Sequence, residues 1–319
     1  MGQVLVTGGT GFVGRHLVCE LKSTKTTIAV LSRSAPVNEQ GVDFYRADVR
    51  EADRVHAVMR MVEPQSVYHL AGISAVAAAD SNPKQTYEVN VMGSYNMFEA
   101  AMNQPGAVRV LNVSTSQVYV QSSGRLHEES PTRTDGHYPF TKAIAESVAS
   151  QYRDCAAGGI ITARPFNHSG PGQSPEFVLS SIAMQFAEME TGYRPPKLTL
   201  GNIRVRRDFT DVRDVVQAYI ALVRRGRCGE VYNVCSGKAV SIEDVVAMFR
   251  QITGIQATVE VDPARVRRND ASQTCGDPTK IQGETGWAPR IPLEVTLSDL
   301  LDHWRQSVRI RTAPKLRTA

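Results

Sequence analysis

A glycine-rich stretch near the start of the chain constrains the fold most. It reads Val4-Leu-Val-Thr-Gly-Gly-Thr-Gly-Phe-Val-Gly14, so three β-favouring residues lead into glycines at positions 8, 11 and 14. Apolar residues with helical spacing follow, at Val13, Leu17, Val18 and Leu21. The stretch therefore predicts a strand, a tight turn and a helix in direct succession.

The chemistry of a dinucleotide explains the glycines. Backbone N–H groups at a helix N-terminus hold a pyrophosphate, and a Cβ at the turn would keep it away. We therefore assign Gly8 to the turn, Gly11 to the phosphate contact and Gly14 to the packing of helix on strand. Phe12 and Val13 complete the expected contacts of this turn with the cofactor. Similar spacings arise by chance, but the flanking strand and helix are the context that the motif requires.

Length, charge and cysteine usage exclude several classes of protein. The 319 residues suffice for one large or two modest domains. No apolar run approaches the ~20 residues of a membrane span, and we expect no secretory signal and no metal site. The five scattered cysteines fit reduced thiols in a cytoplasmic protein. Much of the net charge of +4 lies in arginine clusters, which suit a phosphorylated small molecule better than nucleic acid.

The first half of the chain alternates strand-like and helix-like segments. Strands are expected near residues 3–7, 27–32, 42–46, 66–70, 109–114 and 159–164. This alternation predicts an α/β fold, a Rossmann-like, doubly wound parallel sheet with helices on both faces. The nucleotide would lie at the carboxyl ends of the strands.

The end of the second expected strand separates the two nicotinamide cofactors. NAD sites usually place Asp or Glu there to hold the ribose 2′-hydroxyl. This chain has Ser32, Arg33 and Ser34 instead, and a guanidinium with hydroxyl donors suits the extra phosphate of NADP. We therefore predict NADPH as the cofactor, with NADH as the alternative. An ordinary exposed loop arginine is the competing interpretation of Arg33.

Two polar segments carry the expected chemistry. Val113-Ser-Thr-Ser-Gln-Val-Tyr119 ends the fifth strand, and Tyr138-Pro-Phe-Thr-Lys142 begins a helix. Residues four apart on a helix share one face, so Tyr138 and Lys142 can reach one ligand. A phenol with a reference pKa of ~10 exchanges protons poorly at pH 7 unless a cation stabilises its anion, and Lys142 supplies that cation. The Thr115 hydroxyl can hydrogen-bond a carbonyl oxygen whose carbon receives hydride.

Together these motifs resemble an extended short-chain dehydrogenase/reductase of the nucleotide-sugar branch. The resemblance covers the chain from Thr7 to about Trp304. Its further segments are His69-Leu-Ala-Gly72, Arg164-Pro-Phe-Asn-His-Ser-Gly-Pro-Gly172, Arg207-Asp-Phe-Thr-Asp-Val-Arg-Asp-Val215 and Gly229-Glu-Val-Tyr-Asn-Val-Cys-Ser-Gly237. The narrower likeness is to the GDP-4-keto-6-deoxymannose reductases, and next to the GDP-mannose 4,6-dehydratases.

The resemblance implies further cofactor contacts. Asp48, with Val49, would lie beside the adenine, and Lys142 would also bind the nicotinamide ribose next to Tyr138. The segment that would pass the phosphates and ribose is Leu70, Ala71 and Gly72. We interpret His69 as a satisfied strand-end histidine and Asn90 as structural support.

A second set of residues is expected to bind the substrate. The amide of Asn167 can hydrogen-bond a hexose or diphosphate, and Arg207 can hold a phosphate through two parallel bonds. The resemblance implies that Arg267 and Asp270 hold the diphosphate and the nucleoside ribose. The remaining members are Ser74, Thr115 and Gln117. For each arginine alone, a surface ion pair is the competing interpretation.

The resemblance implies NADPH-dependent reduction of the C4 keto group of a GDP-4-keto-6-deoxyhexose by a homodimer. The product would be GDP-D-rhamnose or GDP-6-deoxy-D-talose, for lipopolysaccharide or other polysaccharide synthesis. Dehydratases of this group carry Glu two places after the catalytic Thr, and here Gln117 cannot accept the C5 proton near neutral pH. Dehydration is therefore disfavoured. Val120 also departs from the Gly that the family usually has after Val-Tyr.

Two other functions compete with this one. An NAD-dependent nucleotide-sugar 4-epimerase would return the hydride to the other face, and Ser32 with Arg33 argues against it. A non-catalytic NADP sensor would have no reason to keep the three catalytic side chains.

The expected domains are a dinucleotide-binding part at 1–165 and a smaller substrate-binding part at 166–310. Part of 203–235 should return to the first domain, so that the two interleave. Residues 311–319 should form a disordered tail.

Overall fold

The computed structural model describes residues 2–24, 26–34, 40–120, 122, 124–152, 158–266 and 271–312, without the side chains of 311 and 312. Its largest feature is a seven-stranded sheet in the order β11-β7-β5-β4-β1-β2-β3, in which every pair is parallel. The strands are β1 (Gln3–Thr7), β2 (Thr27–Ser32), β3 (Val42–Arg46), β4 (Ser66–His69), β5 (Val108–Val113), β7 (Gly158–Pro165) and β11 (Val231–Val234).

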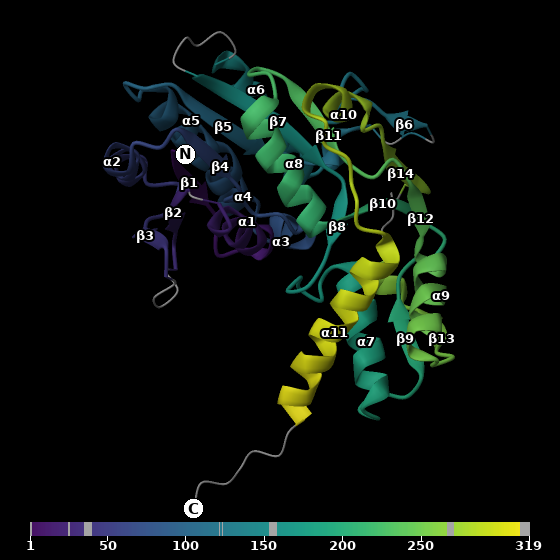
Figure 1. Cartoon of the computed structure of the whole chain (residues 1–319). Helices are drawn as coiled ribbons and strands as arrows, with labels where there is room; N and C mark the ends of the chain where they lie inside the picture. Colours follow the sequence, from purple (N-terminus) through teal and green to yellow (C-terminus); the bar gives the residue numbers. More distant parts are fainter. Residues whose placement is uncertain are drawn as a thin grey trace, which may run out of the picture.

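The predicted doubly wound α/β fold is confirmed. Helices α1 (Phe12–Lys22) and α8 (Val212–Arg225) cover one face of the sheet, and α2 (Ala52–Val62), α5 (Gly93–Met102) and α6 (His137–Ala149) cover the other (Figure 1). All six strands expected from the alternation are present. The seventh, β11, comes from a distant part of the chain and pairs with β7.

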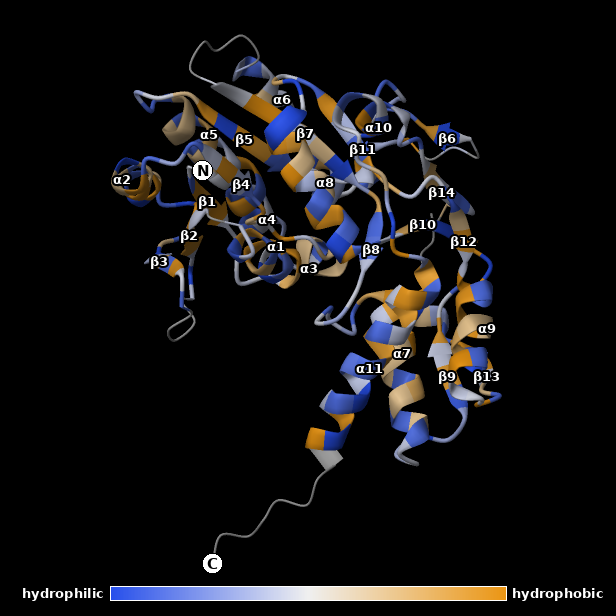
Figure 2. Ribbon diagram, viewed as in Figure 1, coloured by the Kyte–Doolittle hydropathy of each residue, from blue (hydrophilic) through white to orange (hydrophobic). Residues whose placement is uncertain are grey.

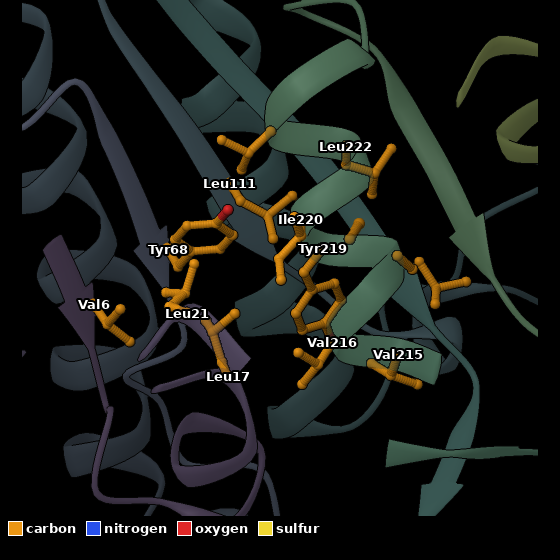
Figure 3. Close-up of a cluster of buried hydrophobic side chains, with 14 of the residues drawn as sticks. Val6, Leu17, Leu21, Tyr68, Leu111, Val215, Val216, Tyr219, Ile220 and Leu222 are labelled. Carbon is orange, nitrogen blue, oxygen red and sulfur yellow. The ribbon is translucent and has the colours of Figure 1, made fainter. Parts of the chain in front are cut away.

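Burial on both faces explains the apolar strands. The four central residues of β2, from Ile28 to Leu31, are all buried, as expected for a strand covered by helices on two sides. A hydrophobic core lies on each face of this sheet. Figure 3 shows the one under α1 and α8, where Leu17 and Leu21 of α1 face Tyr219 and Ile220 of α8. The helices present hydrophilic residues to the outside, visible as blue segments in Figure 2.

A second, smaller part of the molecule has its own core. Its sheet has the order β12-β10-β14-β6, with β8 paired to β10, and a two-stranded sheet joins β13 to β9. The strands are β6 (Arg125–Leu126), β8 (Asn167–Ser169), β9 (Lys197–Leu200), β10 (Arg206–Asp211), β12 (Ala239–Ser241), β13 (Thr258–Val261) and β14 (Gln273–Gly276). Helices α7 (Val178–Glu190), α9 (Ile242–Thr253) and α11 (Leu293–Thr312) pack there.

The remaining helices are short: α3 (Val76–Ser81), α4 (Pro83–Tyr87) and α10 (Thr279–Thr285). Helix α11 includes residues 311 and 312, so the prediction of a disordered tail at 311–319 is wrong for these two residues. The rest of that tail lies outside the described residues. Among the described helices, none is both long and apolar enough to span a membrane. The described side chains contain no cluster of three His, Cys, Asp or Glu that could hold a metal ion.

Candidate active site

The glycine turn joins β1 to α1 in a conformation that needs its glycines. Gly8 has a φ of +69°, and a Cβ on it would lie 2.8 Å from the backbone nitrogen of Ala71. A Cβ on Gly14 would lie 2.2 Å from the Gly8 carbonyl oxygen. Gly14 therefore lets α1 come close to the backbone of the turn, whereas we expected it to serve the packing of helix on strand. Gly11 is the N-cap of α1, and no side chain caps this helix. Its first N–H groups are therefore suited to an anion.

His69 closes β4 as a fully bonded histidine. Its Nδ1 lies 2.8 Å from Thr7 Oγ1 and its Nε2 lies 3.0 Å from Ser94 Oγ. Because Ser94 Oγ donates its own proton to a backbone carbonyl, Nε2 must be the protonated nitrogen. Burial, helped by the charge of Lys142, lowers the pKa of His69 to about 3, so the ring is neutral. Thr7 Oγ1 also accepts the N–H of Ala71, which fixes the segment after β4.

The end of β2 lies beside the glycine turn. Ser32 Oγ is 3.0 Å from Thr10 Oγ1 of that turn. Arg33 is exposed. The Arg50 guanidinium lowers the pKa of Asp48, burial opposes this, and the charge of Arg33 adds to the lowering. Arg33 and Asp48 are therefore electrostatic neighbours, at the carboxyl ends of β2 and β3.

The three predicted catalytic side chains meet beyond the end of β5. Thr115 begins a short 3₁₀ turn, and its Oγ1 accepts the backbone N–H of Gln117 at 3.2 Å. Tyr138 and Lys142 lie one turn apart on α6, and the Thr115 side chain is close enough to the Tyr138 phenol to lower its pKa against the larger effect of burial. The ammonium of Lys142 donates to the Val113 carbonyl at 2.8 Å. All three side chains are buried.

The electrostatics differ from the expected lowering of the phenol pKa by Lys142. Burial raises the pKa of Tyr138, and the Thr115 side chain only opposes that rise. Burial also lowers the pKa of Lys142 to about 8, against the charge of Glu146. In this structure desolvation therefore outweighs the expected effect of the cation. A Cβ on Gly72 would lie 3.2 Å from Lys142 Nζ, which places this ammonium beside the segment after β4.

Asn90 has the supporting role that we expected. It is fully buried in a π-helical turn (Glu88–Met92). Its Oδ1 accepts the N–H of Ile73 at 2.8 Å, and its Nδ2 donates to the Ile73 carbonyl and to Thr141 Oγ1, each at 3.1 Å. These bonds hold the loop after β4, where Ser74 is exposed, against α6.

Two of the expected substrate residues, Asn167 and Arg207, lie on paired strands of the smaller part. Asn167 is exposed on β8, in register with Phe209 of β10. Arg207 lies on β10, and its Nη1 donates to two backbone carbonyls, at Arg206 (2.8 Å) and Ala271 (2.9 Å). Two further expected substrate residues, Arg267 and Asp270, lie outside the described residues.

One buried ion pair was not predicted from the sequence. Arg164 of β7 donates to both carboxylate oxygens of Glu146, with Nη2 at 2.6 Å and Nε at 3.0 Å, and its guanidinium lies over the Tyr119 ring. Glu146 follows Lys142 by one helical turn, and its negative charge favours the charged form of Lys142. The signal for this role was the spacing of four residues between Lys142 and Glu146 on one helix.

Comparison with known proteins identifies the family. Residues 5–300 match the family described as GDP-mannose 4,6 dehydratase. The chain belongs to this family. The resemblance to the nucleotide-sugar branch of the extended short-chain dehydrogenases/reductases is thereby confirmed, and the protein is an oxidoreductase that uses a nicotinamide dinucleotide.

Proteins similar to this chain include enzymes named for GDP-6-deoxy sugars and also UDP-glucose 4-epimerases, such as that of Neisseria gonorrhoeae, which is 25% identical over 95% of this chain and 96% of its own length. GDP-6-deoxy-D-mannose reductase of Pseudomonas aeruginosa is 34% identical over 96% of this chain and 98% of its own length. GDP-6-deoxy-D-talose 4-dehydrogenase of Aggregatibacter actinomycetemcomitans is 28% identical over 89% of this chain and 91% of its own length. A solved structure of RMD from Pseudomonas aeruginosa complexed with NADPH superposes with a TM-score of 0.84 at 33% identity. The match covers 96% of this chain and 100% of that one.

Proposed function

We propose that this protein reduces the C4 keto group of a GDP-4-keto-6-deoxyhexose with NADPH. The product is GDP-D-rhamnose or GDP-6-deoxy-D-talose. The observation that carries the proposal is the buried phenol of Tyr138 beside Thr115, with Gln117 bonded to Thr115 where a dehydratase would need a carboxylate. The two relatives named for GDP-6-deoxy sugars support the same class of substrate.

The residues at the carboxyl ends of the strands fit a dinucleotide. The turn at Gly8 leaves no room for a Cβ, and the first turn of α1 offers N–H groups that no side chain caps. When bound there, NADPH supplies the hydride. The ammonium of Lys142, beside Gly72, is placed to hold the nicotinamide ribose.

The protonation states favour reduction. Because burial raises the pKa of Tyr138, its phenol keeps its proton at neutral pH and can give it to the C4 oxygen as the hydride arrives at C4. Thr115 orients that oxygen by a hydrogen bond, and the added hydride and proton together turn the ketone into an alcohol. We further propose that residues 1–165 bind the dinucleotide and residues 166–310 bind the nucleotide sugar.

Arg33 should determine the choice between NADPH and NADH. We expect Arg33→Ala to weaken NADPH binding by about 1–3 kcal/mol, the scale of a charge-assisted hydrogen bond, and to leave NADH nearly unchanged. Fluorescence titration of both cofactors measures the effect, with Arg54→Ala, at an exposed arginine of α2, as the control. Equal losses for both cofactors would contradict the assignment of Arg33 to the 2′-phosphate.

Gln117 should deny the protein dehydratase activity. We expect the wild type to bind GDP-mannose without dehydrating it, because an amide cannot take the C5 proton. Gln117→Glu should release a trace of the 4-keto-6-deoxy product, at a low rate because its surroundings are not tuned for a base. Product analysis after incubation with NADP⁺ tests both statements. Robust dehydration by the wild type would overturn the reductase proposal.

A further inference from the structure

The first turn of α1 makes ring contacts with the segment that follows β7. The rings of Phe12 and His168 are stacked, with centroids 6.2 Å apart and planes 5° from parallel. His16 meets the other side of this cluster, edge-on to Phe12 at 5.5 Å. Its Nε2 donates to the carbonyl oxygen of Pro171 at 2.9 Å. We call these four residues, Phe12, His16, His168 and Pro171, the latch.

Both imidazoles of the latch have defined donors. A carbonyl oxygen can only accept, so His16 carries a proton on Nε2 and His168 carries one on Nδ1, which lies 3.0 Å from the Phe166 carbonyl. Burial lowers the pKa of His168, so its ring is neutral at neutral pH. The stack is therefore a contact between two neutral rings held at fixed orientation.

On its far side, the latch is anchored in the core of the smaller part. Gln173 Nε2 donates to the His168 carbonyl at 2.8 Å, and its Oε1 accepts from Ser169 at 2.5 Å. The Gln173 carbonyl accepts the Ser180 hydroxyl of α7 at 2.7 Å. That hydroxyl in turn accepts Trp304 Nε1 of α11 at 2.9 Å. These hydrogen bonds therefore connect the segment that carries His168 with α7 and α11.

The latch also lies between the two groups of binding residues. Phe12 directly follows Gly11 of the turn that we assign to the cofactor pyrophosphate. His168 directly follows Asn167, and β8 pairs with β10, which carries Arg207. The stack of Phe12 and His168 therefore connects the glycine turn with the paired strands that carry Asn167 and Arg207.

We propose that the latch couples cofactor binding to nucleotide-sugar binding, with His168 and Phe12 as positioning residues. The inference rests on the proposed function, because it takes the two sites as assigned there. A ligand that orders the residues on one side of the latch leaves fewer residues for the other ligand to order. Each ligand should therefore increase the affinity for the other by the same factor. An aromatic pair of this geometry corresponds to about a two- to ten-fold change in an equilibrium constant.

The test measures the dissociation constant of NADPH by its fluorescence, without and with saturating GDP-mannose, which has no keto group for NADPH to reduce. In the wild type we expect GDP-mannose to lower the dissociation constant of NADPH by about two- to ten-fold. In His168→Ala and in Phe12→Leu this ratio should fall to about one. NADPH binding alone should change much less in His168→Ala, whereas Phe12→Leu can also weaken it, because Phe12 is itself an expected cofactor contact. The variant with both substitutions should lose no more of this coupling than either single variant.

Two variants separate the stack from general damage. His168→Phe keeps a flat ring against Phe12 and should retain most of the coupling. His56→Ala, at a histidine of α2 that pairs with Glu99, should retain all of it. Unchanged coupling in both His168→Ala and Phe12→Leu, or wild-type ligands that bind without any coupling, overturns the latch. Failure of the wild type to bind either ligand overturns the proposed function as well, so the two failures are distinguishable.

Discussion

Replacing Tyr138 with Phe should lower kcat for GDP-4-keto-6-deoxymannose by roughly 10²–10⁴ and leave NADPH affinity near that of the wild type. The substitution removes the general acid and creates no cavity, because the ring stays in place. The loss should appear in kcat, since the phenol lies beside Thr115 at the end of β5 and its proton is needed only as the C4 oxygen gains charge. Steady-state kinetics with a separate NADPH titration measures both quantities.

Tyr219→Phe provides a matched control for this experiment. Tyr219 is also buried, and no hydrogen bond to its hydroxyl is found within the part of the chain that the structure describes. Removing that hydroxyl should leave turnover and stability nearly unchanged, because no described partner is left unpaired. Wild-type turnover in Tyr138→Phe would show that this constellation is not the active site.

Lys142→Met should damage both the rate and the affinity for NADPH. The substitution removes the ammonium beside Gly72, which we assign to the nicotinamide ribose, and with it a positive charge that would stabilise the phenolate left when Tyr138 gives up its proton. The pKa of Lys142 is about 8, so wild-type activity that depends on its charge should fall as the pH rises above that value. In any residual activity of Lys142→Met, the fall above about pH 8 should be absent, because methionine has no proton to lose. An unchanged affinity together with an unchanged pH profile would contradict the assigned role.

The same substitution should not weaken the fold at pH 7. Burial lowers the pKa of Lys142 below its usual value, so the unfolded chain binds more protons than the folded chain between about pH 8 and the usual lysine range. Stability therefore rises with pH across that window, and the charged lysine opposes folding at neutral pH. A midpoint of thermal unfolding at pH 7 that is equal to or above the wild-type value would show that activity is lost for a functional reason.

The sequence by itself determined the features that depend on near neighbours in the chain. The glycine turn between β1 and α1, the six alternating strands and the shared helix face of Tyr138 and Lys142 all follow from spacing over a few residues. The family resemblance rests on the same local motifs. That is why the fold, the family and the class of cofactor were predictable from residues alone.

Only the tertiary structure decided what depends on approach between distant segments. It placed β11 beside β7, paired Arg164 with Glu146 and stacked His168 on Phe12. It also reversed the expected electrostatics of the site, because desolvation depends on how completely the fold removes Tyr138 and Lys142 from water. Spacing along a chain determines which side chains share a helix face, but burial and contacts across the chain arise only when all the elements have packed.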